Sequence, residues 1–160
     1  MQSNVYSIML DVRVLDELSA FSMPNLFKMY HAEAKVTDEL NIPNLMKHMF
    51  IALHSSNMVI FGAFDDNKLI GFMWGYMEES MWTGQLHTRE VALYINPDYR
   101  GRTLANRLIS HLEKWAISQG AVYLNVGANS GINDNAPATR LYTHLGYNKV
   151  GVSLTKKIGE

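Results

Sequence analysis

A strand, a turn, a helix and a second apolar strand follow one another between residues 85 and 126. Residues 85–95 form the first strand, which the turn sequence Asn96-Pro97-Asp98 ends. The helix carries its apolar side chains on one face, at Leu104, Leu108, Ile109, Leu112 and Trp115. Residues 121–126 are a nearly continuous apolar run, which is typical of a strand buried on both faces. Parallel strands need such a crossover, so this unit predicts a right-handed parallel pair inside a mixed sheet.

Further strands and helices are predicted on both sides of this unit. Residues 6–15 partly alternate apolar and polar side chains, which favours a strand. Two apolar runs at 58–64 and 69–77, separated by a polar turn, favour a β-hairpin. Helices are predicted at 24–35, 43–54 and 135–145, and a last strand at 147–156. No repeat or linker divides the chain, so residues 1–160 are predicted to form a single domain.

Composition excludes several classes of function. The 160 residues include no cysteine, which excludes disulfides, thiolate zinc sites and a cysteine nucleophile. Fourteen basic and fifteen acidic residues give a net charge of −1, so nucleic acid is not an expected partner. No signal peptide and no apolar run of about 18 residues is present, so we expect no membrane association and a cytoplasmic location. The six histidines show no ligand spacing, so no metal site is predicted.

The turn before the central helix has the chemistry of an anion site. Arg100-Gly101-Arg102-Thr103 leads from the end of a strand into a helix, whose first N–H groups point at whatever lies beyond the strand. The helix dipole and two arginine forks add positive charge, and glycine lets the backbone approach a ligand closely. A pyrophosphate group would fit there. The alternative is an ordinary helix start with solvated arginines.

The whole stretch EVALYINPDYRGRTLANRLISHLEKWA resembles the central motif of the GCN5-related N-acetyltransferase superfamily. In that superfamily, an Arg/Gln-x-x-Gly-x-Gly/Ala loop holds the pyrophosphate of coenzyme A. Arg100 and Ala105 match the ends of this pattern, and Thr103 stands where the family has its central glycine. We expect the threonine to cap the helix and to donate to a phosphate.

A second motif of the same superfamily follows downstream in NDNAPATRLYTHLGY. It resembles the pattern Asn-x-x-Ala-x-x-x-Tyr-x-x-x-Gly-Phe, matched here by Asn135, Ala138, Tyr142, Gly146 and Tyr147. The resemblance covers residues 58–156. It implies an α/β fold with a central mixed, mostly antiparallel twisted sheet of six to seven strands, about four flanking helices, and a splayed parallel pair at the cofactor site.

The resemblance implies an acyltransferase that uses acetyl-coenzyme A and passes the acetyl group directly to a primary amine, without a metal. The implied cofactor-binding residues lie on one strand, on the loop that follows it and on the last helix: Leu93, Tyr94, Ile95, Arg100, Gly101, Arg102, Thr103, Leu104, Ala105, Asn135 and Ala138. Asn135 would hydrogen-bond the pantetheine arm or cap the last helix.

Two residues carry the implied acid–base chemistry. Tyr142 would protonate the leaving thiolate, and its alternative role is that of a core tyrosine with a satisfied hydroxyl. Glu90 would accept the proton of the amine through water, unless it is an exposed strand residue paired with Arg89 or a lysine. His87 is the second candidate base because its reference pKa is close to neutrality. Glu78 and Glu79 are further candidates.

The acceptor is expected between the first helices and the hairpin. This region holds an aromatic and acidic set that would suit a cationic amine, with Tyr30, Glu33, Trp74 and Glu78 as candidate substrate-binding residues. The alternative for these residues is core packing with a solvated rim. Ten methionines, several of them near this region, could line an adaptable pocket or the surface of a homodimer.

Two other functions are compatible with these motifs. The fold could bind coenzyme A structurally, or have lost it through Thr103, and act as a non-catalytic module that binds a partner protein. The Arg-Gly loop could also bind another nucleotide, but neither a GxxxxGK[ST] loop nor a GxGxxG fingerprint is present.

Overall fold

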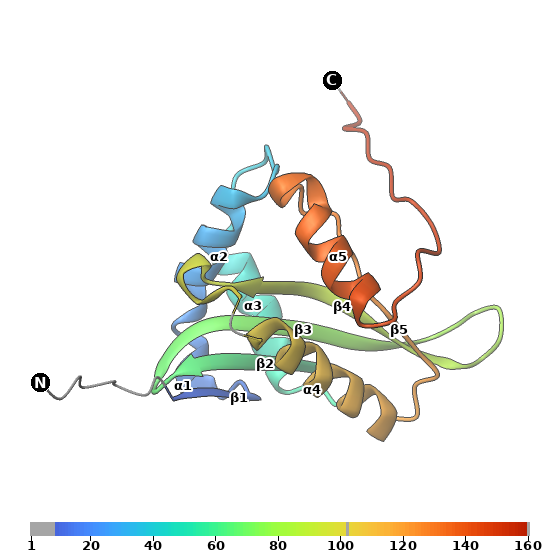
Figure 1. Ribbon diagram of the computed structural model, residues 1–160, viewed down its shortest axis with the longest axis horizontal. Coiled ribbons are helices and arrows are strands. Elements are labelled where there is room, and N and C mark those ends of the chain that lie inside the picture. Colours follow the sequence, from blue (N-terminus) through green and yellow to red (C-terminus); the bar gives the residue numbers. More distant parts are fainter. Residues whose placement is uncertain (1–8, 102, 160) are drawn as a thin grey trace, which may run out of the picture.

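The computed structural model describes residues 9–101 and 103–159, which form one layer of β-sheet covered by helices on both faces (Figure 1). The strands are β1 (Leu10–Val14), β2 (Met58–Asp65), β3 (Lys68–Glu79), β4 (Leu86–Ile95) and β5 (Tyr123–Asn125). The α-helices are α1 (Glu17–Ala20), α2 (Met23–Glu33), α3 (Ile42–Leu53), α4 (Leu104–Ser118) and α5 (Ala136–His144). Two short 3-10 helices, η1 (Pro97–Tyr99) and η2 (Ile132–Asn135), precede α4 and α5.

The sheet is mixed, and its strands lie in the order β1-β2-β3-β4-β5. The first four strands pair antiparallel with their neighbours, and β5 pairs parallel with β4. The crossover helix α4 joins β4 to β5, which confirms the parallel pair predicted from residues 85–126. Helices α1, α2 and α3 pack on one face of the sheet, and α4 and α5 pack on the other.

Local sequence signals explain where most elements begin and end. Asp66 adopts a positive φ of 52° in the turn between β2 and β3, a conformation that aspartate tolerates better than most residues. The Asn41 side chain accepts a hydrogen bond from the Asn44 N–H and caps α3. Gly120 follows α4 with a φ of 85°, as a helix-ending glycine does. Asp16 caps the short helix α1, which the sequence analysis missed.

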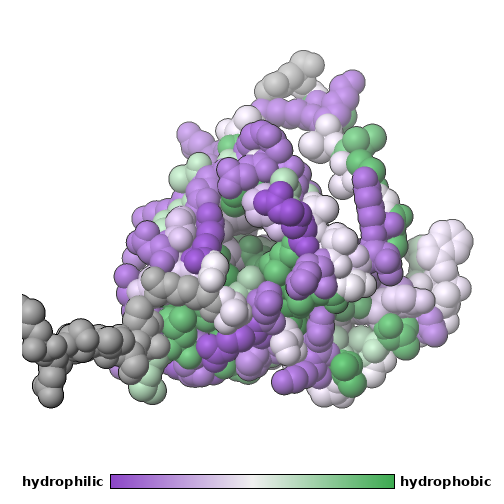
Figure 2. Space-filling view, viewed as in Figure 1, coloured by the Kyte–Doolittle hydropathy of each residue, from purple (hydrophilic) through white to green (hydrophobic). Residues whose placement is uncertain are grey.

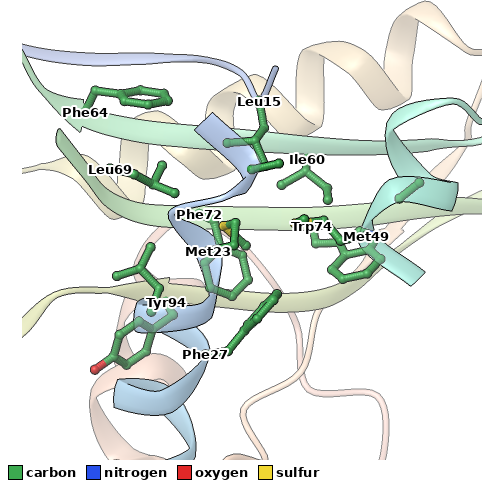
Figure 3. Packing of buried hydrophobic residues seen from close by; sticks show 13 residues of the cluster. Leu15, Met23, Phe27, Met49, Ile60, Phe64, Leu69, Phe72, Trp74 and Tyr94 are labelled. Atoms are coloured by element: carbon green, nitrogen blue, oxygen red, sulfur yellow. The ribbon is translucent and has the colours of Figure 1, made fainter. Parts of the chain in front are cut away.

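Two hydrophobic cores lie on opposite faces of the sheet. The first contains Phe72, which meets Phe27 of α2 edge-on with ring centroids 5.5 Å apart. Figure 3 shows Trp74 among these core residues and Tyr94 at their edge. The second core lies between the sheet and α4, where the predicted apolar helix face includes the fully buried Leu108 and Leu112.

The predicted last strand, residues 147–156, is wrong in this structure, because the segment has no helix or strand. Val150, Val152 and Leu154 alternate as in a strand, but their side chains are 92%, 73% and 90% exposed. The described part of the sheet therefore has five strands rather than six to seven. A strand forms only when a neighbour pairs with it, and local alternation does not supply that neighbour.

The position of β5 also differs from the prediction. The strand was expected to be buried on both faces, but it is a three-residue edge strand whose Tyr123 is 62% exposed. No strand among the described residues covers its outer edge. The first strand begins at Leu10, and the residues before Met9 that were assigned to it lie outside the described residues. Within the described ranges, no helix has the length and apolar character to cross a membrane.

Candidate functional site

The site lies where β4 and β5 separate. Their parallel pairing comprises three residue pairs and ends at Arg89 and Asn125, whereas β4 continues to Ile95. A cavity of about 510 Å³ lies along the far end of β4 and the start of α4, and one of about 140 Å³ adjoins it beside Glu90. Figure 2 shows a hollow near the middle of this face, with hydrophobic residues at its floor and hydrophilic residues around it. The splayed geometry leaves room for an elongated ligand between two strands.

A β-bulge in β4 sets the direction of the candidate base. Trp74 pairs with Ala92, and the next residue of β3, Gly75, pairs with Glu90, so that Val91 is an extra residue in β4. Adjacent residues of β3 face opposite sides of the sheet, and their partners therefore do so too. Trp74 packs in the core under α2 and α3, whereas a Cβ at Gly75 would meet α4. The bulge thus turns Glu90 toward the face that carries α4 and α5.

Glu90 and Tyr142 meet at the inner end of the smaller cavity. The Tyr142 hydroxyl donates to Glu90 Oε2 at 2.7 Å, and the Gly127 N–H approaches the same oxygen at 3.3 Å. Burial raises the pKa of Glu90 above its ordinary value, and the two hydrogen bonds only partly offset this. Burial and the neighbouring Glu90 charge raise the pKa of Tyr142, so its hydroxyl keeps its proton at neutral pH. The two predicted catalytic side chains are therefore in direct contact.

Helix α2 brings Tyr30 to the other side of the same cavities and Glu33 to the arginine of the loop. Tyr30 lines both cavities, and its ring lies 5.3 Å from that of Tyr94. Burial and the Glu90 charge raise the pKa of Tyr30. Glu33, one turn further along α2, forms a bidentate ion pair with Arg100 and accepts a hydrogen bond from the Tyr94 hydroxyl. From the sequence, Glu33 was expected to bind the acceptor and Arg100 to bind the cofactor.

The predicted cofactor loop lines the larger cavity. Its lining includes most of the predicted cofactor residues, namely Leu93, Tyr94, Ile95, Arg100, Gly101, Thr103, Leu104, Ala105 and Ala138. Hydrogen bonding within α4 begins with the Arg107 N–H, which donates to the Thr103 carbonyl oxygen at 3.0 Å. The earlier N–H groups of the first helical turn therefore have no partner inside the helix and can serve an anion. Arg102 lies outside the described residues.

Neither Thr103 nor Asn135 caps its helix with its side chain, although the sequence had predicted such caps. Thr103 stands at the N-cap of α4, but its side chain makes no capping hydrogen bond, because its backbone is left-handed with a φ of 64°. Asn135 stands at the N-cap of α5, also left-handed, and its side-chain oxygen accepts from the Gly131 N–H at 2.7 Å instead of capping the helix. Asn135 thus holds the loop that closes the cavity.

The left-handed backbone at Thr103 gives a testable prediction. A residue with a side chain loses about 1–2 kcal/mol of stability in this left-handed conformation. Glycine avoids that cost, but its more flexible unfolded chain takes back about 0.5–1 kcal/mol. We expect Thr103→Gly to raise the free energy of unfolding by up to about 1 kcal/mol, measured by urea denaturation. Gly101, with a φ of 76° and no heavy atom within 4 Å of an added Cβ, is the matched position. Gly101→Ala should destabilise, and a stable Gly101→Ala protein would contradict the strain argument.

Like Glu33 and Asn135, four other candidates line neither cavity. Trp74 is buried in the core, with its indole nitrogen lacking a hydrogen-bond partner among the described residues. Glu78 forms an ion pair with Arg89, so Arg89 is not the partner of Glu90 that the alternative for Glu90 required. His87 packs on Tyr123 with ring centroids 5.1 Å apart, where β4 and β5 pair. Glu79 ends β3 opposite Leu86. Core packing thus holds Trp74 away from the cavities, and an ion pair holds Glu78.

The loop that forms one wall of the cavities was not predicted from the sequence. Gly127, Ala128, Asn129 and Ser130 line the smaller cavity, and Ile132 and Asn133 line the larger one. The run of small and polar residues between β5 and α5 was the available signal for a loop at this place. Among the described residues, no group of three or more histidine, aspartate or glutamate side chains is arranged to hold a metal ion.

Two curated relatives share part of the sequence. An acetyltransferase of Yersinia pestis is 44% identical over 55 residues, which are 34% of this chain and 37% of the relative. An acetyltransferase of Sodalis glossinidius is 36% identical over 84 residues, which are 51% of this chain and 57% of the relative. The chain thus spans between a third and three fifths of the length of these relatives.

Solved structures share the fold across the whole chain. An aminoglycoside N-acetyltransferase solved with a coenzyme A bisubstrate analogue aligns with a TM-score of 0.78 at 15% identity, over 93% of this chain and 97% of that one. A ribosomal-protein-alanine N-acetyltransferase from Brucella melitensis aligns with a TM-score of 0.77 at 22% identity, over 95% and 99%. Residues 20–147 match the acetyltransferase (GNAT) family model. With the fold, the motifs and this match in agreement, the chain belongs to the GNAT acetyltransferase family.

Proposed function

We propose that the protein transfers the acetyl group of acetyl-coenzyme A directly to a primary amine. The observation that carries this proposal is the hydrogen bond between Tyr142 and Glu90, placed in a cavity that adjoins the anion-binding start of α4. An acid and a base in contact, next to a site for a phosphate-bearing donor, fit acyl transfer better than simple binding.

The residues of the larger cavity fit acetyl-coenzyme A. The helix start and the Arg100 loop suit its pyrophosphate, and the open edge of β4 at Leu93–Ile95 offers backbone groups to its amide-bearing arm. Ala138 and Leu141 supply an apolar wall on the α5 side. When bound, acetyl-coenzyme A supplies the acetyl group as a reactive thioester. Its thioester end would then lie toward the smaller cavity, where Glu90 and Tyr142 meet.

The contact between Glu90 and Tyr142 permits both proton transfers of the reaction. Glu90 accepts the proton of the attacking amine, directly or through one water molecule, while the nitrogen–carbon bond forms. The negative charge of Glu90 is one cause of the high pKa of Tyr142, so neutralising Glu90 makes the phenol more acidic. Tyr142 then gives its proton to the leaving thiolate as the carbon–sulfur bond breaks. The carboxyl proton of Glu90 returns to Tyr142 through their 2.7 Å hydrogen bond.

The acceptor is expected to enter beside Tyr30, which lines both cavities. The first acceptors to test are an aminoglycoside and a peptide with an N-terminal alanine, because proteins of the same fold carry these substrates in their names. Both present a primary amine. The acidic side chain of Glu90, which lines the smaller cavity, favours a cationic acceptor there.

The test measures binding and turnover separately. Calorimetric titration with acetyl-coenzyme A should show saturable binding, and thiol release with an amine panel should exceed that of Tyr142→Phe. Binding without thiol release from any amine would favour the non-catalytic module. Absence of binding would contradict the proposed cofactor and turn attention to partner proteins.

A further inference from the structure

Arg100, the arginine of the predicted pyrophosphate loop, forms an ion pair with Glu33 of the same chain. Both terminal nitrogens of Arg100 donate to Glu33, one to each carboxylate oxygen, at 2.9 Å. The third guanidinium nitrogen, Nε, donates to the Ile95 carbonyl oxygen at 3.0 Å. The outer fork of Arg100 is therefore directed at α2, although the residue lines the larger cavity. Carboxylates and phosphates are recognised by the same bidentate geometry, so Glu33 holds the arginine as a phosphate oxygen pair would.

Glu33 is anionic in this arrangement. Burial raises the pKa of its carboxyl, but the hydrogen bonds from Arg100 and Tyr94 outweigh this and hold the pKa below its usual range. The charge of Arg100 is thus neutralised before any ligand arrives. A pyrophosphate at the start of α4 meets both a neutralised arginine and a nearby negative charge.

We propose that Glu33 is an internal competitor of the cofactor pyrophosphate for Arg100, and that it sets the affinity for coenzyme A. The inference rests on the proposed function, which assigns the pyrophosphate to this loop. When the cofactor binds, Arg100 exchanges its partner from Glu33 to the pyrophosphate. The last turn of α2, one turn beyond Tyr30, then loses its ion pair to the loop. Cofactor binding thereby loosens the helix on the acceptor side before the amine enters.

Glu33→Gln tests this competition, because glutamine keeps the shape of the side chain and removes its charge. Calorimetry should show that the variant binds coenzyme A about tenfold more tightly than the wild type, a factor within the usual range of coupling between sites. Pantetheine lacks the pyrophosphate, so its affinity should be the same for both proteins. The difference between the two ligands is the signature of competition at Arg100.

Asp11→Asn is the matched control. Asp11 also pairs with an arginine, Arg13 at 2.8 Å, but on β1, at the opposite edge of the sheet from β5. This variant changes the net charge equally and should leave both affinities unchanged. Arg100→Gln in the wild-type and Glu33→Gln backgrounds completes a double-mutant cycle, in which the gain from Glu33→Gln should vanish without the arginine.

Several results would overturn the proposal. If Glu33→Gln weakens coenzyme A and pantetheine equally, Glu33 is a structural support for the loop and not a competitor. If the wild type binds coenzyme A and Glu33→Gln binds it no more tightly, this inference alone is wrong. If neither protein binds coenzyme A, the proposed function fails with it. Thermal unfolding of each variant verifies that it is folded, and Glu33→Ala provides a second charge removal should Glu33→Gln not fold.

Discussion

Replacing Glu90 with glutamine should lower kcat for acetyl transfer by about a hundred- to ten-thousandfold, the usual contribution of a positioned acid–base group. Glutamine keeps the hydrogen bond to Tyr142 but cannot take a proton from the amine. Because burial raises the pKa of Glu90, the wild-type rate should fall on the acid side at a higher pH than an ordinary glutamate would give. A pH profile of kcat/KM measures this, and the acid limb should be absent from Glu90→Gln.

Unfolding would not explain such a loss. A carboxyl whose pKa is higher in the folded protein than in the unfolded chain contributes stability at low pH, and this contribution is lost as the pH rises through the folded pKa. At neutral pH, Glu90→Gln should therefore be no less stable than the wild type. Tyr142→Phe should also slow transfer. The fall in kcat of the double variant should be far smaller than the product of the two single falls, because the two groups act as a unit. Full activity of Glu90→Gln would contradict the mechanism.

Phe72→Ala should have the largest effect on stability, with a loss of about 3–5 kcal/mol in the free energy of unfolding. Phe72 is fully buried at the centre of the first core and packs edge-on against Phe27, so its removal leaves a cavity between β3 and α2 (Figure 3). The whole free energy of unfolding of a natural protein is only about 5–15 kcal/mol. Chemical denaturation with a linear extrapolation measures the change.

An exposed leucine is the control for this prediction. Leu18 of α1 is 82% exposed, so Leu18→Ala removes a similar apolar group without leaving a cavity. Its effect should stay within about 0.5 kcal/mol, the usual range for surface substitutions. A loss below about 1 kcal/mol for Phe72→Ala would mean that the core around it rearranges to fill the space.

The sequence predicted the parts of the fold that depend on local periodicity. The helix face of α4, the hairpin of β2 and β3 and the strand–helix–strand crossover all follow from patterns within a few tens of residues. The position of Tyr142 on the inner face of α5 also followed from helical spacing. The direct contact of Tyr142 with Glu90 was not predicted, since 52 residues separate them and the family resemblance implied only a separate role for each.

Long-range pairing explains most of what the sequence did not predict. Residues 147–156 alternate like a strand, yet β5 offers them no partner in this structure. Glu33 and Arg100 are 67 residues apart, so no local pattern indicates that one would hold the other. Trp74 was a candidate for the acceptor site because it is aromatic and lies in the hairpin, but the packing of α2 and α3 places it in the core. In each case a neighbour distant in the sequence decided the outcome.

The bulge at Val91 means that the site depends on how β4 pairs with β3 as well as on the residues that β4 carries. Side-chain scanning reports what each residue contributes, but it does not test the pairing that sets the direction of Glu90. Without the bulge, Val91 would pair with Gly75, and Glu90 would share the face of Ala92, under α2 and α3, with every catalytic residue still present in the chain. Homologues of this protein should thus be aligned around β4 by strand pairing first, because a homologue that lacks the extra residue matches at both Glu90 and Ala92 only when the gap is placed at Val91.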